Sequence, residues 1–174
     1  NSLYNLEDNN WADLRNRENR IKKGFPEPVN WCHGAPGIGI SRIFFSEIIG
    51  HEQYMQDINR AIIKTLESGF GGSDCLCHGS MGNIELLLLS YQKLKNEQMY
   101  KKILSILSDL IEGAKKEKWL CGIPQKTDVV GFMTGLSGIG YELLRCLNPE
   151  QIPCMFAFEF PKNRNCKIGA NFNE

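Results

Sequence analysis

Three Gly-x-x-Gly turns, each followed by an apolar stretch, constrain the fold of this 174-residue chain more than any other feature. They lie at Gly34/Gly37, Gly79/Gly82 and Gly135/Gly138, at intervals of 45 and 56 residues. Self-similarity at such a period is typical of arrays of helical hairpins. Glycine at these turns permits backbone conformations and a close helix approach that a side chain would prevent. The sequence therefore predicts a repeated helical unit.

Two alternating kinds of helix are expected in this array. The first kind follows each turn and is apolar nearly all round, which predicts burial on most sides, over residues 36–49, 83–95 and 137–147. The second kind has an apolar stripe and a charged face, which predicts a covering helix that faces water, over residues 52–68 and 99–116. Ile152 to Phe160 is the one strand-like stretch.

The predicted fold class is all-α, built of αα-hairpin repeats. A hairpin cannot bury its apolar helix alone, so three of them form a short solenoid or an arc of a closed α/α toroid. An arc leaves its inner face exposed, and we therefore expect an incomplete barrel whose other repeats lie outside this chain.

We divide the chain into three parts. Residues 1–30 are polar and charged and form a partly helical connector, with a short helix expected from Trp11 to Ile21 and ended by the following glycine and prolines. Residues 31–161 hold the three repeats. Residues 162–174 form a polar tail.

Composition excludes several classes of function. Lys+Arg and Asp+Glu balance at 20 each, so no net charge favours a nucleic acid or an anionic membrane surface. The longest apolar runs are far shorter than a transmembrane segment, and the first residues lack the pattern of a signal peptide. We expect a cytoplasmic protein. The chain does not begin with Met, and we expect it to be part of a longer protein.

Seven cysteines without regular spacing argue against a secreted disulfide framework. Cys75, Cys121, Cys146 and Cys154 are expected to be buried small residues. Cys77 differs, because His78 follows it directly and the repeat places Cys32 at the equivalent position. Residues just before each turn lie at the same end of the inner helices, so these side chains can converge.

Two thiolates and an imidazole suit Zn²⁺, and three protein ligands leave a fourth position open, as in catalytic zinc sites. The sequence thus predicts a metal site of Cys32, Cys77 and His78. Two alternatives remain at this point. The cysteines could simply be buried, or Cys75 or His33 could complete a closed structural site.

Three ordered motifs resemble one family. W-C-H-G-A-P-G-I-G-I-S-R from Trp31, C-H-G-S-M-G-N from Cys77 and G-F-M-T-G-L-S-G-I-G-Y-E-L-L-R from Gly131 are together similar to the lanthionine synthetase C-like (LanC) cyclases. They are most similar to the cyclase domain at the C-terminal end of class II (LanM-type) lanthipeptide synthetases. The resemblance covers about Trp31 to Pro161.

The resemblance implies an α/α toroid of seven inner and seven outer helices, with zinc held by Cys32, Cys77 and His78. It also implies a reaction, the addition of peptide Cys thiols to dehydroalanine or dehydrobutyrine to form lanthionine or methyllanthionine rings. The substrate would be a ribosomally made precursor peptide with a leader. The resemblance also implies a bacterial protein, which a biosynthetic and export complex could hold near a membrane. The family's acidic residue and histidine for proton transfer would lie in upstream repeats. We expect His33, beside Cys32, to orient substrate or assist that transfer.

ATP and Mg²⁺ would serve only a dehydratase domain that this chain does not contain. Two other functions stay open from the sequence: a LanC-like zinc protein that binds another thiol, such as a small cellular thiol, and a non-catalytic α-repeat scaffold.

Overall fold

The computed structural model describes residues 3–15, 18, 22–50 and 52–160. The all-α prediction is confirmed, since five long helices dominate the described residues. The elements are β1 (Tyr4–Asn5), β2 (Asn10–Trp11), α2 (Ala35–Ile49), α3 (Glu52–Ser68), α4 (Ser80–Leu94), α5 (Glu97–Lys116), η1 (Pro124–Lys126), α6 (Leu136–Leu147) and η2 (Met155–Ala157). The expected tail, residues 162–174, lies outside the described residues, as does Cys166.

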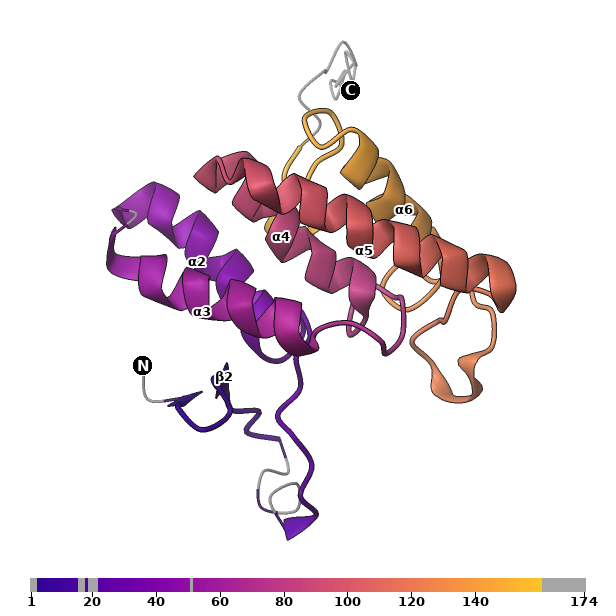
Figure 1. Cartoon of the computed structure of the whole chain (residues 1–174), viewed down its shortest axis with the longest axis horizontal. Helices are drawn as coiled ribbons and strands as arrows, with labels where there is room; N and C mark the ends of the chain where they lie inside the picture. The colour runs from indigo at the N-terminus through magenta and orange to yellow at the C-terminus, as the bar shows by residue number, and fades with distance from the viewer. Residues whose placement is uncertain (1–2, 16–17, 19–21, 51, 161–174) are drawn as a thin grey trace, which may run out of the picture.

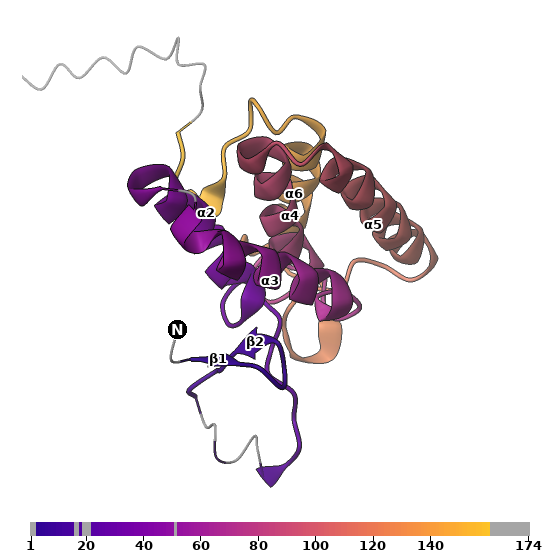
Figure 2. The ribbon, with the colours of Figure 1, turned by 60° about the vertical axis from the view of Figure 1, so that its left-hand side comes forward.

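The helices form two antiparallel hairpins and a third inner helix. α2 pairs with α3, α4 pairs with α5, and α6 packs on the far side of α4 (Figure 1). In a view turned by 60°, α4 still lies between α2 and α6, with α3 and α5 outside (Figure 2). The inner helices are therefore the ones that follow the Gly-x-x-Gly turns, as the sequence predicts.

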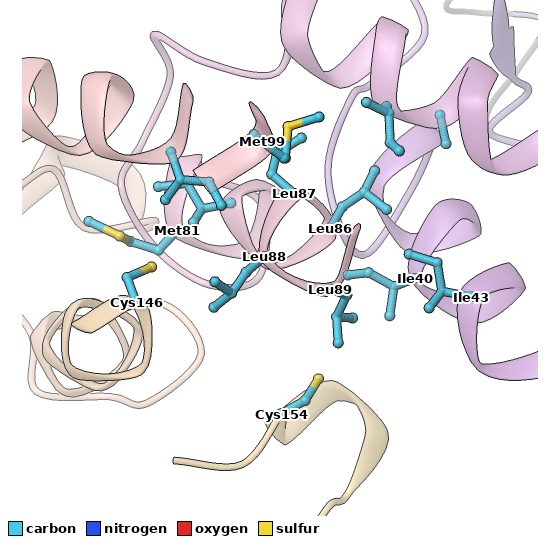
Figure 3. Packing of buried hydrophobic residues seen from close by; sticks show 14 of the residues in the cluster. Ile40, Ile43, Met81, Leu86, Leu87, Leu88, Leu89, Met99, Cys146 and Cys154 are labelled. Atoms are coloured by element: carbon cyan, nitrogen blue, oxygen red, sulfur yellow. The ribbon is translucent and has the colours of Figure 1, made fainter. Parts of the chain in front are cut away.

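The centre of the core is α4, whose residues from Ser80 to Ser90 are all buried. Leu86 to Leu89 lie between Ile40 and Ile43 of α2 on one side and Cys146 of α6 on the other (Figure 3). Burial of a leucine side chain contributes about 1.5–3 kcal/mol. This run therefore carries much of the apolar stabilisation that joins the three repeats.

The expected burial on most sides is wrong for the two flanking inner helices. α2 and α6 each have α4 as their one inner neighbour among the described residues. Large apolar side chains on them are exposed, namely Phe45, Ile48 and Ile49 on α2 and Leu136, Leu144 and Leu147 on α6. This pattern agrees with the expectation of an arc whose edges lack their neighbours.

A buried ion pair fixes α6 against α4. Arg145 Nε donates to Glu85 Oε2 at 2.6 Å, and its Nη2 donates to Glu85 Oε1 at 2.7 Å. Both side chains are 1% exposed. Burial, with the Glu85 charge, raises the pKa of Glu142 well above its usual range, so that this neighbour stays protonated. The three side chains together thus carry one carboxylate charge against one guanidinium charge.

The strand expected over Ile152 to Phe160 is wrong. These residues hold the short 3-10 helix η2, and the chain returns across the inner helices to α2. Phe156 stacks on Trp31 with ring centroids 4.3 Å apart, and Tyr141 Oη donates to Pro153 O at 2.8 Å. Phe156 therefore serves a tertiary packing contact, whereas Phe158 and Phe160 are exposed.

The helix expected from Trp11 is also wrong at its start. Trp11 lies in β2 and residues 12–15 are not helical, whereas residues 16–17 and 19–21 lie outside the described part. The Asn10 side chain explains why this segment is extended. It is fully buried and lies against the first residue of α2. Its Nδ2 donates to Pro28 O at 3.0 Å, and its Oδ1 accepts from the Ala35 N–H at 2.9 Å.

The repeated glycines are required by close backbone contact. A Cβ on Gly37, Gly82 or Gly138 would lie 2.0, 1.8 or 1.8 Å from the carbonyl oxygen of the residue six positions earlier. The first glycine of each motif meets a carbonyl at the same separation, at 2.0–2.4 Å. Each loop before an inner helix thus folds directly onto the first turn of that helix.

This contact can be tested on two glycines of α6. We expect Gly138→Ala to lower the free energy of unfolding by about 3 kcal/mol, because its Cβ would overlap the Phe132 carbonyl. Gly140→Ala is the matched control, since a Cβ there meets nothing within 4 Å. It should raise stability by about 0.5–1 kcal/mol through helix propensity. Urea unfolding of the full-length protein measures both, and equal effects would contradict the contact.

Candidate metal centre

The loops before the inner helices are joined by a ladder of backbone hydrogen bonds. Cys32 N–H donates to Cys77 O at 3.2 Å, and Cys77 N–H donates to Met133 O at 2.8 Å. These three residues occupy equivalent positions in the three repeats. Each repeat therefore donates to the next at the same point, and the ladder aligns the loops at one end of the inner helices.

This alignment brings together the three side chains that the sequence predicts as metal ligands. The candidate ligand atoms of Cys32, Cys77 and His78 all lie within 4.8 Å of one another, and each residue is partly buried. Neither Cys75 nor His33, the alternative fourth ligands, belongs to this group, and no other His, Cys, Asp or Glu of the described residues joins it. Three candidate ligands are thus brought together.

The Cys32 thiol does not ionise readily in the protein alone. Burial, with the charge of the neighbouring Cys77, raises the pKa of the Cys32 thiol to about 11. Cys32 and Cys77 each lie three residues before the first residue of an inner helix, α2 or α4. The partial positive charge at a helix N-terminus favours thiolates there, but only modestly. A divalent cation would supply the larger part of the charge.

Gly122 lies directly against His78, and its lack of a side chain leaves space for the imidazole ring. A Cβ on Gly122 would lie 2.7 Å from His78 Nε2 and 2.4 Å from Cys75 Sγ. The segment carrying Gly122 is fixed by Asp74, whose N–H donates to Leu120 O at 2.7 Å and whose carboxylate accepts from the Leu120 N–H at 2.8 Å. The missing side chain at 122 is therefore part of the geometry of the centre.

Asparagines tie the first loop to the second. Asn83, the last residue of the C-H-G-S-M-G-N motif, is fully buried, and its Nδ2 donates to Val29 O at 2.8 Å and to Gly69 O at 2.6 Å. With its amide oriented so that the nitrogen faces the neighbouring carbonyl oxygens, Asn30 donates to His78 O at 3.1 Å. These contacts set the loop of Cys32 beside the loop of Cys77 and His78.

His33 faces a carboxylate that sequence reasoning missed. Its Nδ1 lies 3.6 Å from Oδ1 of Asp13, which is 5% exposed. Arg15 donates to Asp13 through Nε at 3.1 Å and Nη2 at 2.9 Å, and this hydrogen bond lowers the Asp13 pKa to about 2. Asp13 is thus ionised beside His33. Only the N-terminal hairpin, in which β1 pairs antiparallel with β2, brings Asp13 to this place, because Asp13 belongs to no motif.

Comparison with known proteins agrees with this geometry. The family model described as lanthionine synthetase C-like protein matches residues 1–157. The chain belongs to the lanthionine synthetase C-like family. The match includes the N-terminal hairpin, which packs on the first loop, as well as the three repeats.

One similar protein is the lacticin 481/lactococcin biosynthesis protein LcnDR2 of Lactococcus lactis subsp. lactis. It is 29% identical over 163 residues, which cover 82% of this chain and 17% of that protein. The present chain therefore corresponds to a small part of its relative's length.

Within the described residues, each helix is either too short or too polar to cross a lipid bilayer.

The remaining cysteines behave as the sequence predicts. Cys75, Cys121, Cys146 and Cys154 are all buried, and none of the described cysteines forms a disulfide. Burial raises the pKa of the Cys146 thiol far above its usual range, so that thiol stays neutral.

The Gly122 contact yields a direct test of the centre. We expect Gly122→Ala to lower the affinity for a divalent metal by about 10–100-fold, because the new Cβ displaces the His78 ring. Gly131→Ala, whose Cβ would meet only Thr134 Oγ1 at 3.7 Å, should leave affinity unchanged. Competition with a chromophoric chelator measures both. Equal affinities for Zn²⁺ in the two variants would show that His78 is not a ligand.

Proposed function

We propose that this chain is the zinc-bearing C-terminal part of a lanthipeptide cyclase. The observation that carries the proposal is the convergence of Cys32, Cys77 and His78 within 4.8 Å in a chain of the LanC-like family. One imidazole and two thiols match the donors that zinc prefers, and three ligands leave the open position of a catalytic site. The Cys32 thiol, whose pKa is raised by partial burial, also fits this ion, because a cation would favour its thiolate.

Ring closure adds a cysteine S–H across the C=C bond of a dehydrated residue. Sulfur forms a bond to Cβ, the π bond breaks, and a proton returns to Cα, so the reaction needs no external oxidant or reductant. A zinc ion in the centre would keep the substrate thiol ionised and nucleophilic near neutral pH. Cys32, Cys77 and His78 would hold that ion.

His33 is the residue of this chain placed to handle the proton or orient the substrate. It follows Cys32 directly, and the ionised Asp13 carboxylate lies beside its Nδ1. A carboxylate at one ring nitrogen fixes the tautomer and orientation of an imidazole, as in other acid–base pairs. The other nitrogen would then be free to face the substrate. We assign His33 this role, with Asp13 as its positioning residue.

The substrate would be a cysteine-containing precursor peptide that has already been dehydrated. This assignment follows the name of the similar lacticin 481/lactococcin biosynthesis protein and the resemblance to class II synthetases. The exposed apolar residues of α2 and α6, such as Ile48 and Leu147, would pack on further repeats of the same barrel. ATP and Mg²⁺ would act at a separate dehydratase domain.

The test is cyclisation of a dehydrated precursor peptide by the complete enzyme. We expect Cys32→Ala to lose stoichiometric zinc and to slow ring formation by roughly 100-fold or more, because it removes a ligand. His33→Ala should keep zinc and lose about 10²–10⁴-fold in kcat. Metal analysis and mass spectrometry with thiol alkylation give the two readouts.

Cys154→Ala is the control, since Cys154 is buried in the C-terminal segment and outside the cluster. It should keep both zinc and activity. Full zinc content in Cys32→Ala would contradict the site. A wild-type enzyme that holds zinc and binds thiols, but closes no rings on a dehydrated peptide, would instead support a thiol-binding protein.

A further inference from the structure

A cavity adjoins the metal centre on the side of the N-terminal hairpin. Its volume is about 420 Å³, and its walls include Leu3, Trp11, Ala12, Trp31 and Ile38 together with Cys32 and His33. Cys32, which belongs to the centre, and the adjacent His33 add a thiol and an imidazole to these walls. Small-molecule and side-chain sites commonly have this form, an apolar hollow with a few placed polar groups.

The aromatic walls of this cavity are held from behind. Trp31 stacks on Phe156 at 4.3 Å, with an angle of 14° between the rings. Trp11 is 4% exposed and packs edge to face on Tyr4 at 4.9 Å. The Arg60 guanidinium lies over the Tyr4 ring, 4.5 Å from its centroid. The shape of the hollow is therefore set before any ligand enters.

We infer that this cavity is the subsite for the electrophile, the dehydroalanine or dehydrobutyrine side chain of the peptide. The inference rests on the proposed function. The alkene must come within bonding distance of a sulfur held at the centre, and Cys32 is shared between the centre and the cavity wall. A dehydrated side chain is small, flat and apolar, as these walls require.

The cavity would also place the alkene beside the sulfur that attacks it. Walls of leucine, isoleucine and tryptophan would hold the alkene against an apolar surface, while the peptide backbone would stay outside. The electron pair of the sulfur forms the new bond to Cβ, the π electrons move toward Cα, and Cα then takes a proton. His33 lines the same cavity and is therefore the residue placed to handle that proton.

Dehydrobutyrine carries one methyl group more than dehydroalanine, so the subsite should sense the difference. One added or missing carbon in an apolar pocket changes specificity by about 10–200-fold. We expect Ala12→Leu, which narrows the hollow, to reduce kcat/KM for dehydrobutyrine at least about tenfold more than for dehydroalanine. Leu3→Ala, which opens it, should raise KM for both residues by several-fold to about tenfold.

The matched control is Leu6→Ala, because Leu6 belongs to the same N-terminal hairpin, is 75% exposed and does not line the cavity. The experiment compares the complete zinc-loaded enzymes on two synthetic peptides that differ only in the dehydrated residue. Zinc content and binding of an undehydrated cysteine peptide, followed by the thiolate absorption of the Co²⁺ form, should be unchanged in all variants.

Several results would overturn the inference without touching the proposed function. One is a wild type that cyclises in a zinc-dependent manner while Ala12→Leu and Leu3→Ala behave as Leu6→Ala does. Another is a lower melting temperature for Ala12→Leu without peptide and unchanged selectivity, which would mean that another part of the enzyme fills the hollow. Loss of zinc dependence in the wild type would instead remove the proposed function itself.

Discussion

The backbone hydrogen bonds that join Cys32 to Cys77 and Cys77 to Met133 are the constraint on which the centre depends. They lock the register of neighbouring repeats at the point where each loop meets its helix. Because the donors and acceptors belong to the main chain, the register does not depend on the side chains that do the chemistry. Those side chains are therefore free to be two thiols and an imidazole in two repeats, and a methionine in the third.

The register in turn requires the glycines. Each loop approaches the first turn of its helix so closely that a Cβ would overlap a carbonyl oxygen, as at Gly37 and Gly82. Gly122 extends the same principle to a loop outside the repeats, where it leaves room for the His78 ring. Close approach of backbone, rather than bulky packing, thus shapes the end of the molecule that carries the centre, whereas leucines shape the interior of α4.

The sequence predicts the parts whose physical cause is periodic. The five helices follow from apolar spacing, and the convergence of Cys32 with Cys77 follows from aligning two repeats. Prediction from the sequence fails where a single tertiary contact decides the structure. Asn10 and Trp11 form a hairpin because they cap and cover the first loop, and Phe156 leaves a strand-like pattern to stack on Trp31. Asp13 gives no signal, since only that hairpin brings it to His33.

The most direct measurement of the central claim is X-ray absorption at the zinc edge of the complete protein, before and after addition of an undehydrated cysteine peptide. Without peptide, the account predicts two sulfur ligands and one imidazole nitrogen from the protein, with a light atom in the fourth position. With peptide, it predicts three sulfurs. Four protein ligands, or a sulfur count that the peptide thiol leaves unchanged, would contradict an open metal centre that holds the nucleophile.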